Sequence, residues 1–477
     1  MSPAPPDLED QAPFLERAFT IEVVEGIADL AVEGALPAFV SGTAYWNGPG
    51  RFERFGQQYR HWLDGDGMVC ALRLTGARPR VTNRFVRSEK FVQEEAAGRR
   101  LFRQFGTSFD GDRLKRGVGL ESPANVSVYP FAGALLAFGE QGLPWAIDPQ
   151  TLATRSLYTF GGQLNDVTPF SAHPKCDTAT GEMFNFGVAF GTSGATLHLF
   201  RFSRGGALEY RRRVPLPYAA SIHDFAISAT YAVFYVSPLV LDIALLLRGG
   251  ATLMDALRWE PARGSALLIV RRDTGEPVVT VPAGDKYCLH LANAFESPSG
   301  LVVDLIECDR PVYDQYQVIP ALFTEVAPGA LVRVTVDVEG GAIVDHRRLP
   351  YTLAPDFPTH DVALTALPCD DYWMLGIGAT GRPGRKFLNQ LVRCDWSCDG
   401  VEVYEAPRGQ YLGGEPLFLP DPSTPREGVV ICPIFDAERV QSSFGVFDAR
   451  RVSRGPIATL ASPHPIPLLF HSSHLPD

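Results

Sequence analysis

Short runs of alternating apolar and polar residues recur along almost the whole chain and restrict it to an all-β fold. Typical runs are GALLAFGE, TLHLFRFS, YAVFYVS, LVVDLIE and GVVICPIFD. Most of them end in turn residues, as in RRDTGEP and LDGDGMV. The 45 Gly and 39 Pro residues leave little room for long helices. We therefore expect antiparallel meanders rather than alternating strands and helices.

Many short strands in one chain of 477 residues favour a β-propeller. Seven blades of about 40 to 50 residues each, the usual range, would leave a remainder for excursions. No internal repeat is visible, and helical signal is concentrated in residues 238–260. The N-terminus, MSPAPPDLEDQAP, is Pro-rich and acidic, so we expect residues 1–15 to form a disordered arm before a single propeller domain over 16–477.

Charge and cysteine content exclude several function classes. The formal net charge is -11 and no Lys/Arg cluster stands out, which argues against nucleic acid as a partner. The closest cysteines, Cys394 and Cys398, have no second pair near them, so neither a zinc site nor a disulfide framework is expected. The longest nearly apolar run, residues 236–247, is too short to span a bilayer. We expect a cytoplasmic protein with reduced thiols.

Three histidines lie among small or apolar residues at the edges of strand-like runs: His173 in FSAHPK, His223 in SIHDFAIS and His290 in YCLHLANAFE. They are 50 and 67 residues apart, which is about one to one and a half blades. A propeller brings the inner strand of every blade to one axis, so these side chains could converge on a metal ion. A core histidine bonded to a carbonyl explains each of them separately.

Eight strings resemble those of the carotenoid cleavage oxygenases and occur in the same order: NGPGRF, HWLDGDGMV, ALLAFGEQGLPWAIDPQTLAT, FSAHPK, SIHDFAIS, HLANAFE, GGEPLFLP and PIPLLFH. The resemblance runs from Gly42 to the C-terminus. It implies a seven-bladed β-propeller with a dome of loops and helices over its top face, where four histidines hold one non-haem Fe(II) per chain. The implied ligands are His173, His223, His290 and His471; His464 and His474 flank the last of these, but His471 follows PLLF, as the family ligand does.

Neutral imidazoles suit Fe(II) but supply no negative charge, so carboxylates are expected to accept hydrogen bonds from the ligands. The resemblance assigns this part to Glu140 and Glu415, and to Asp356 where the family usually has glutamate. Because aspartate is one methylene shorter, we expect its bond to be longer or water-bridged. Two other departures are Val126, where many relatives have threonine, and Ser472, where glycine is usual.

The resemblance also implies the reaction, in which O2 is inserted across a C=C bond of an apolar carotenoid or apocarotenoid to give two carbonyl products. Candidate residues of the substrate tunnel are Phe105, Val126, Tyr129 and Phe225, although core packing explains each of the aromatic residues as well. Relatives that cleave stilbenoids place a lysine immediately before the outer glutamate. Gly139 at this position favours the carotenoid branch, and stilbenoid cleavage stays open as the alternative.

Carotenoids reside in lipid, so residues 238–257 are expected to contact a membrane surface peripherally. A helix packed on the propeller is the competing interpretation of this segment. Two other functions remain: the non-oxidative isomerohydrolase chemistry of the retinal pigment epithelium, which uses the same four-histidine iron, and a non-catalytic propeller that binds a lipid or a partner. Propellers host many functions, so the fold alone does not choose between them.

Overall fold

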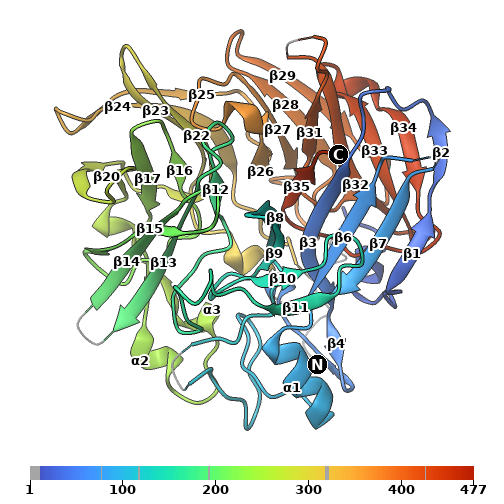
Figure 1. The fold of residues 1–477 in the computed structure, drawn as a ribbon, viewed down its shortest axis with the longest axis horizontal. Helices are drawn as coiled ribbons and strands as arrows, with labels where there is room; N and C mark the ends of the chain where they lie inside the picture. Colours follow the sequence, from blue (N-terminus) through green and yellow to red (C-terminus); the bar gives the residue numbers. More distant parts are fainter. Residues whose placement is uncertain (1–10, 77, 117–118, 192–193, 317–321, 425) are drawn as a thin grey trace.

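Antiparallel sheets surround a central axis in a ring (Figure 1). The structure is a computed structural model that describes residues 11–76, 78–116, 119–191, 194–316, 322–424 and 426–477. Within these residues the strands form seven sheets of four to six strands, the blades of a propeller, and two small two-stranded sheets. The predicted all-β, seven-bladed propeller is confirmed.

Five blades each contain four strands that follow one another along the chain. The second has β8 (Ser127–Phe131), β9 (Ala134–Phe138), β10 (Trp145–Ile147) and β11 (Thr154–Leu157), and the third has β12 (Lys175–Cys176), β13 (Met183–Gly191), β14 (Gly194–Phe202) and β15 (Leu208–Pro215). The fourth has β16 (Ala226–Ile227), β17 (Tyr231–Val236), β20 (Ala266–Arg271) and β21 (Pro277–Pro282). The fifth has β22 (Tyr287–Ser297), β23 (Gly300–Cys308), β24 (Gly329–Asp337) and β25 (Ala342–Arg348), and the sixth has β26 (Asp356–Thr359), β27 (Asp371–Gly376), β28 (Gln390–Asp395) and β29 (Gly400–Glu405).

The first and seventh blades close the ring by exchanging strands from the two ends of the chain. The first contains β1 (Gly26–Asp29), β3 (Thr43–Arg51), β6 (Asp66–Arg73), β7 (Arg80–Phe85) and the last strand, β35 (Ser472–Leu475). The seventh contains β2 (Ala31–Gly34), β30 (Gln410–Leu412), β31 (Leu417–Pro420), β32 (Gly428–Asp436), β33 (Gln441–Asp448) and β34 (Pro456–Ala461). Pairing of β35 with β3 and of β2 with β34 therefore ties the end of the ring to its beginning.

Burial explains why inner and outer strands differ in sequence. The inner strand β22 reads YCLHLANAFES and is buried over its first nine residues, because blades pack on both of its faces. The outer strand β25 reads AIVDHRR and is largely exposed, so charged residues protect its free edge. Apolar clusters fill the spaces between neighbouring blades, as between the fourth and fifth.

Two excursions from the blades pack on each other beside the ring. One carries α1 (Glu89–Ala97), and the other runs through β18 (Leu239–Leu241), α2 (Ile243–Leu246), α3 (Leu253–Ala256) and β19 (Leu257–Trp259). Arg103 Nη1 donates to the carbonyl of Leu246 at 2.8 Å, and the Met254 amide donates to the carbonyl of Phe105 at 2.9 Å. The remaining short elements are β4 (Glu53–Arg54), β5 (Gln57–Gln58), η1 (Leu15–Phe19), η2 (Trp62–Asp64), η3 (Pro261–Arg263), η4 (Tyr313–Tyr316), η5 (Val362–Leu364) and η6 (Val452–Arg454).

Two local predictions need correction. The helical signal over 238–260 corresponds to two single-turn helices between paired strands, because a capping box at Thr252 begins α3 and the chain turns again after Ala256. Residues 1–10 of the predicted arm lie outside the described residues, whereas Ala12 and Leu15 are fully buried, so the boundary predicted at residue 15 is wrong. Among the described helices, none has the length and apolar content to cross a membrane.

Candidate metal centre

Four histidines reach the propeller axis from the innermost strands of four blades. His173 and His223 lie just before β12 and β16, His290 is within β22, and His471 immediately precedes β35. Because each blade begins or ends its inner strand at the axis, residues far apart in sequence meet there. The structure thus brings together all four histidines named from the sequence.

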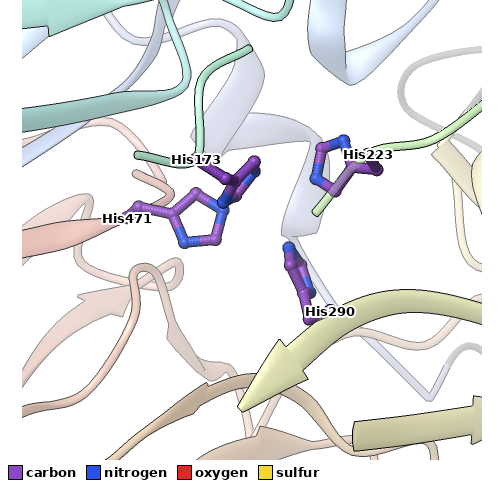
Figure 2. Close-up of side chains that lie close together, drawn as sticks. All are labelled: His173, His223, His290 and His471. Atoms are coloured by element: carbon purple, nitrogen blue, oxygen red, sulfur yellow. The ribbon is translucent and has the colours of Figure 1, made fainter. Parts of the chain in front are cut away.

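The four imidazole rings converge in one small space (Figure 2). One nitrogen of each ring lies within 4.8 Å of the corresponding nitrogens of the other three. His173, His290 and His471 are 3% to 5% exposed, and the side chain of His223 is 8% exposed. The competing histidines lie elsewhere, with His464 exposed and His474 Nε2 bonded to the carbonyl of Ser41.

The donor set fits a divalent transition metal. Nε2 of His173 and of His290 are buried and have no hydrogen-bond partner among the described residues, as expected for nitrogens that face a cation. Burial and the neighbouring imidazoles lower the pKa of His173 well below its ordinary value, so its ring stays neutral. Neutral imidazole is the form that binds metals such as iron.

Carboxylates orient three of the four rings. In each case Nδ1–H donates to a carboxylate oxygen, which leaves Nε2 directed at the centre of the cluster. The pairs are His223 with Glu140 at 2.8 Å, His290 with Asp356 at 2.6 Å, and His471 with Glu415 at 3.2 Å. The three carboxylates named from the sequence therefore all contact the histidine cluster.

The bond expected to be long or water-bridged is in fact direct and the shortest of the three. β26 has an irregular register between Asp356 and Thr359, and Phe357 adopts a left-handed backbone conformation with φ of 54°. Such a conformation is rare for a bulky residue and marks a locally constrained backbone. The bend offsets the missing methylene and brings Asp356 up to His290.

Sequence reasoning missed a fourth carboxylate, Asp224. Its Oδ1 lies 3.9 Å from Nδ1 of His173, beyond hydrogen-bond distance, and 2.8 Å from Nζ of Lys175. Its Oδ2 accepts a hydrogen bond from the Leu291 amide at 2.9 Å. The only available signal was its position next to His223, which does not reveal that it turns towards His173.

An apolar cavity adjoins the cluster. Its walls include two of the predicted tunnel residues, Phe105 and Val126, together with Leu63, Leu120, Leu253 and Glu140. The carbonyl of Val126 accepts a hydrogen bond from the His471 amide at 3.3 Å, so this wall lies directly beside the histidine cluster.

The other two predicted tunnel residues do not line this cavity. Phe225 stacks on Phe234 in the core of the blades, with ring centres 5.1 Å apart, and Tyr129 packs edge-on against Phe138. For Phe225 the tunnel prediction is wrong and the core-packing interpretation holds, because the space between blades also requires aromatic side chains.

A buried pair of ionisable groups fixes the loop that carries Phe105. Asp64 accepts hydrogen bonds from the Gly106 amide at 2.9 Å and from the Thr107 hydroxyl at 2.5 Å. His61 donates from Nε2 to the carbonyl of Tyr313 at 2.9 Å. Burial raises the pKa of Asp64 to about 6 and lowers the pKa of His61 to about 4.

These opposite shifts predict a pH effect in the variant Asp64→Asn. As pH falls, folded Asp64 binds its proton before the unfolded chain does, which stabilises the fold by about 3 kcal/mol, whereas His61 destabilises it by a similar amount. Without Asp64 the gain is lost, so between pH 7 and 4 the free energy of unfolding should fall about 2 kcal/mol further than in wild type. Denaturant unfolding of metal-free protein measures this. Equal slopes in the two proteins would contradict it, and Asp345→Asn, an exposed change, is the control.

This chain is similar to known proteins over nearly its whole length. The family model described as retinal pigment epithelial membrane protein matches residues 18–476. Apocarotenoid-15,15'-oxygenase of Synechocystis sp. is 31% identical over 468 residues, covering 93% of this chain and 92% of that protein. Resveratrol cleavage oxygenase 1 of Aspergillus fumigatus is 32% identical, covering 90% and 88%. The crystal structure of cobalt-substituted Synechocystis apocarotenoid oxygenase is similar with a TM-score of 0.89 at 28% identity, covering 98% and 100%.

Proposed function

This chain belongs to the retinal pigment epithelial membrane protein family, that of the carotenoid cleavage oxygenases, and on this premise we propose that it cleaves a C=C bond of an apocarotenoid or carotenoid with O2. Each O atom ends in one of two carbonyl products. The observation that carries the proposal is the buried cluster of four histidines with carboxylates on three of them. We propose one Fe(II) per chain, held by His173, His223, His290 and His471 of a single catalytic domain.

The protein positions the reactants and excludes water. Fe(II), when bound, would hold and activate O2, while the four electrons that reduce O2 come from the double bond that is cleaved. The neutral imidazoles bring no charge, so Glu140, Asp356 and Glu415 offset that of the cation through hydrogen bonds to the ligands. Val126 and Phe105 give an apolar wall to the adjoining cavity, which has a volume of about 40 Å³. No acid–base pair is needed, because cleavage by O2 transfers no proton.

The space around Gly139 supports the carotenoid class over the stilbenoid class. A Cβ added at this glycine would lie 1.9 Å from Ser122 Oγ and 3.1 Å from Ala124 Cα. The lysine that stilbenoid-cleaving relatives carry here therefore cannot be accommodated unless Ser122 moves. Stilbenoids remain the second candidate, since resveratrol cleavage oxygenase 1 is 32% identical to this chain.

Product analysis tests the proposal. Metal-free protein is reconstituted with Fe(II) without oxygen, then exposed to O2 with a β-apo-carotenal or with resveratrol. We expect two carbonyl products from the apocarotenal, with the cut position reporting the depth of the cavity. Cleavage of resveratrol alone would reverse the substrate assignment. If the protein binds iron but cleaves neither the apocarotenal nor resveratrol, the proposed metal centre stands and both proposed substrate classes are wrong.

We further propose a cytoplasmic enzyme that takes its substrate from a membrane surface through residues 238–257. In this segment Leu247 is 50% exposed beside the exposed Arg248, an arrangement suited to the lipid interface. Co-sedimentation with phospholipid vesicles tests this contact, and binding that is unchanged in Leu247→Glu would contradict it.

A further inference from the structure

The outer carboxylates differ in what holds the oxygen that faces away from the histidine. Asp356 Oδ2 accepts a hydrogen bond from the Tyr316 hydroxyl at 3.1 Å. Glu415 Oε2 accepts two, from the Ser472 amide at 2.8 Å and from the Ser472 hydroxyl at 3.1 Å. The corresponding oxygen of Glu140 is buried without a partner among the described residues. Two of the three carboxylates, Asp356 and Glu415, thus accept hydrogen bonds on both oxygens.

Aromatic side chains pack around Tyr316. It ends the short turn η4, and its ring packs against Trp62 and Phe323 with centroid distances of 5.7 Å and 5.1 Å. The side chain is buried, and burial together with the charge of Asp356 raises the pKa of its hydroxyl well above the ordinary value. The hydroxyl therefore remains a donor at every working pH.

The hydrogen bond from Tyr316 restricts rotation of the Asp356 carboxylate about its Cβ–Cγ bond. Oδ1 already accepts from His290 Nδ1 at 2.6 Å and from the Phe357 amide at 2.9 Å. With Tyr316 on Oδ2, the plane of the carboxylate is fixed by three donors in different directions. Without Tyr316, Oδ2 loses the one donor that the described residues offer it, which costs free energy that rotation of the carboxylate can relieve. Such rotation would turn the ring of His290 away from the centre of the cluster.

We propose that Tyr316 and Ser472 are positioning residues of the metal centre, whose hydroxyls fix Asp356 and Glu415 and through them the rings of His290 and His471. This inference rests on the proposed metal binding but not on the proposed substrate. We expect Tyr316 to contribute more to metal affinity than Ser472, because among the described residues it is the one donor to Oδ2 of Asp356. The hydroxyl and the backbone amide of Ser472 both donate to Oε2 of Glu415, and the amide hydrogen bond remains when the side chain is substituted.

The test measures Co(II) binding to metal-free protein, by titration of the visible absorption of the bound ion. Loss of an outer partner of a metal ligand costs about ten- to a hundredfold in affinity, so Tyr316→Phe should weaken Co(II) about tenfold and Ser472→Ala about threefold. The matched control is Tyr351→Phe, another buried tyrosine, whose hydroxyl donates to Gln390 at 2.7 Å. It should bind Co(II) as tightly as wild type.

A purely structural role predicts a different pattern. In that case Tyr316→Phe and Tyr351→Phe would lower the melting temperature of the metal-free protein alike and leave the Co(II) affinity and spectrum unchanged, which would overturn the proposal. If Tyr316→Phe does not fold, Ser472→Ala decides, and wild-type affinity in that variant overturns the proposal. Wild-type protein that fails to bind Co(II) would refute the metal centre itself, whereas normal Co(II) binding without substrate cleavage would refute the substrate alone.

Discussion

His290→Ala should abolish metal retention and lower the rate of cleavage by at least about a thousandfold, more than the ten- to hundredfold cost in affinity of losing an outer partner. His290 lies within the buried strand β22, at a point where the pairing of β22 with β23 is irregular between Cys288 and Leu291. Removing it also leaves the carboxylate of Asp356, which is 17% exposed, without its imidazole partner. Iron content by mass spectrometry and product formation from the apocarotenal measure the two effects.

The matched control for this variant is His346→Ala. His346 lies on the outer strand β25 and pairs with Glu307 at 2.9 Å, away from the axis. Iron content and rate should therefore be unchanged. Full iron retention by a folded His290→Ala protein would contradict the assignment of His290 as a ligand, and circular dichroism of the metal-free protein verifies the fold.

The blades could be predicted because burial produces alternation of apolar and polar residues in the sequence. For the same reason His173, His223 and His290 stood out as polar rings among apolar neighbours. His471 did not stand out in this way. Nothing in PLLFHSS indicates that the last strand returns to pair with β3, and only the resemblance to the family pointed to this histidine.

The details of the outer contacts could not be predicted from the sequence. The short bond of Asp356 depends on the left-handed backbone at Phe357 and on a tyrosine 40 residues earlier in the chain. Neither the left-handed backbone nor the contact with the distant tyrosine can be recognised from the identities of the residues. Phe225 was predicted as a tunnel residue because it lies in the same string as His223, but the blade core requires aromatic residues as much as a substrate tunnel does.

Val126→Phe should lower kcat/KM for the apocarotenal by about a hundredfold while iron content stays at the wild-type level, because an ångström-scale displacement of a reactant can cost that much. Val126 is 3% exposed, lines the apolar cavity and bonds the backbone of His471 through its own carbonyl. The backbone bond survives the substitution, so the ligand keeps its place. We expect the added phenyl ring to take up space in the cavity beside the histidine cluster, where we propose that the substrate binds.

Val126→Thr separates size from polarity at this position. Threonine has nearly the volume of valine and takes up no additional cavity space, so we expect at most about a tenfold decrease in kcat/KM, which corresponds to a cost of about 1.4 kcal/mol for the added hydroxyl. Steady-state kinetics on both variants, normalised to bound iron, make the comparison. If Val126→Phe cleaved at the wild-type rate, the substrate would have to reach the metal by another route than this cavity. If threonine were as damaging as phenylalanine, polarity rather than space would govern the position, and the apolar wall would act by excluding water from the reacting double bond.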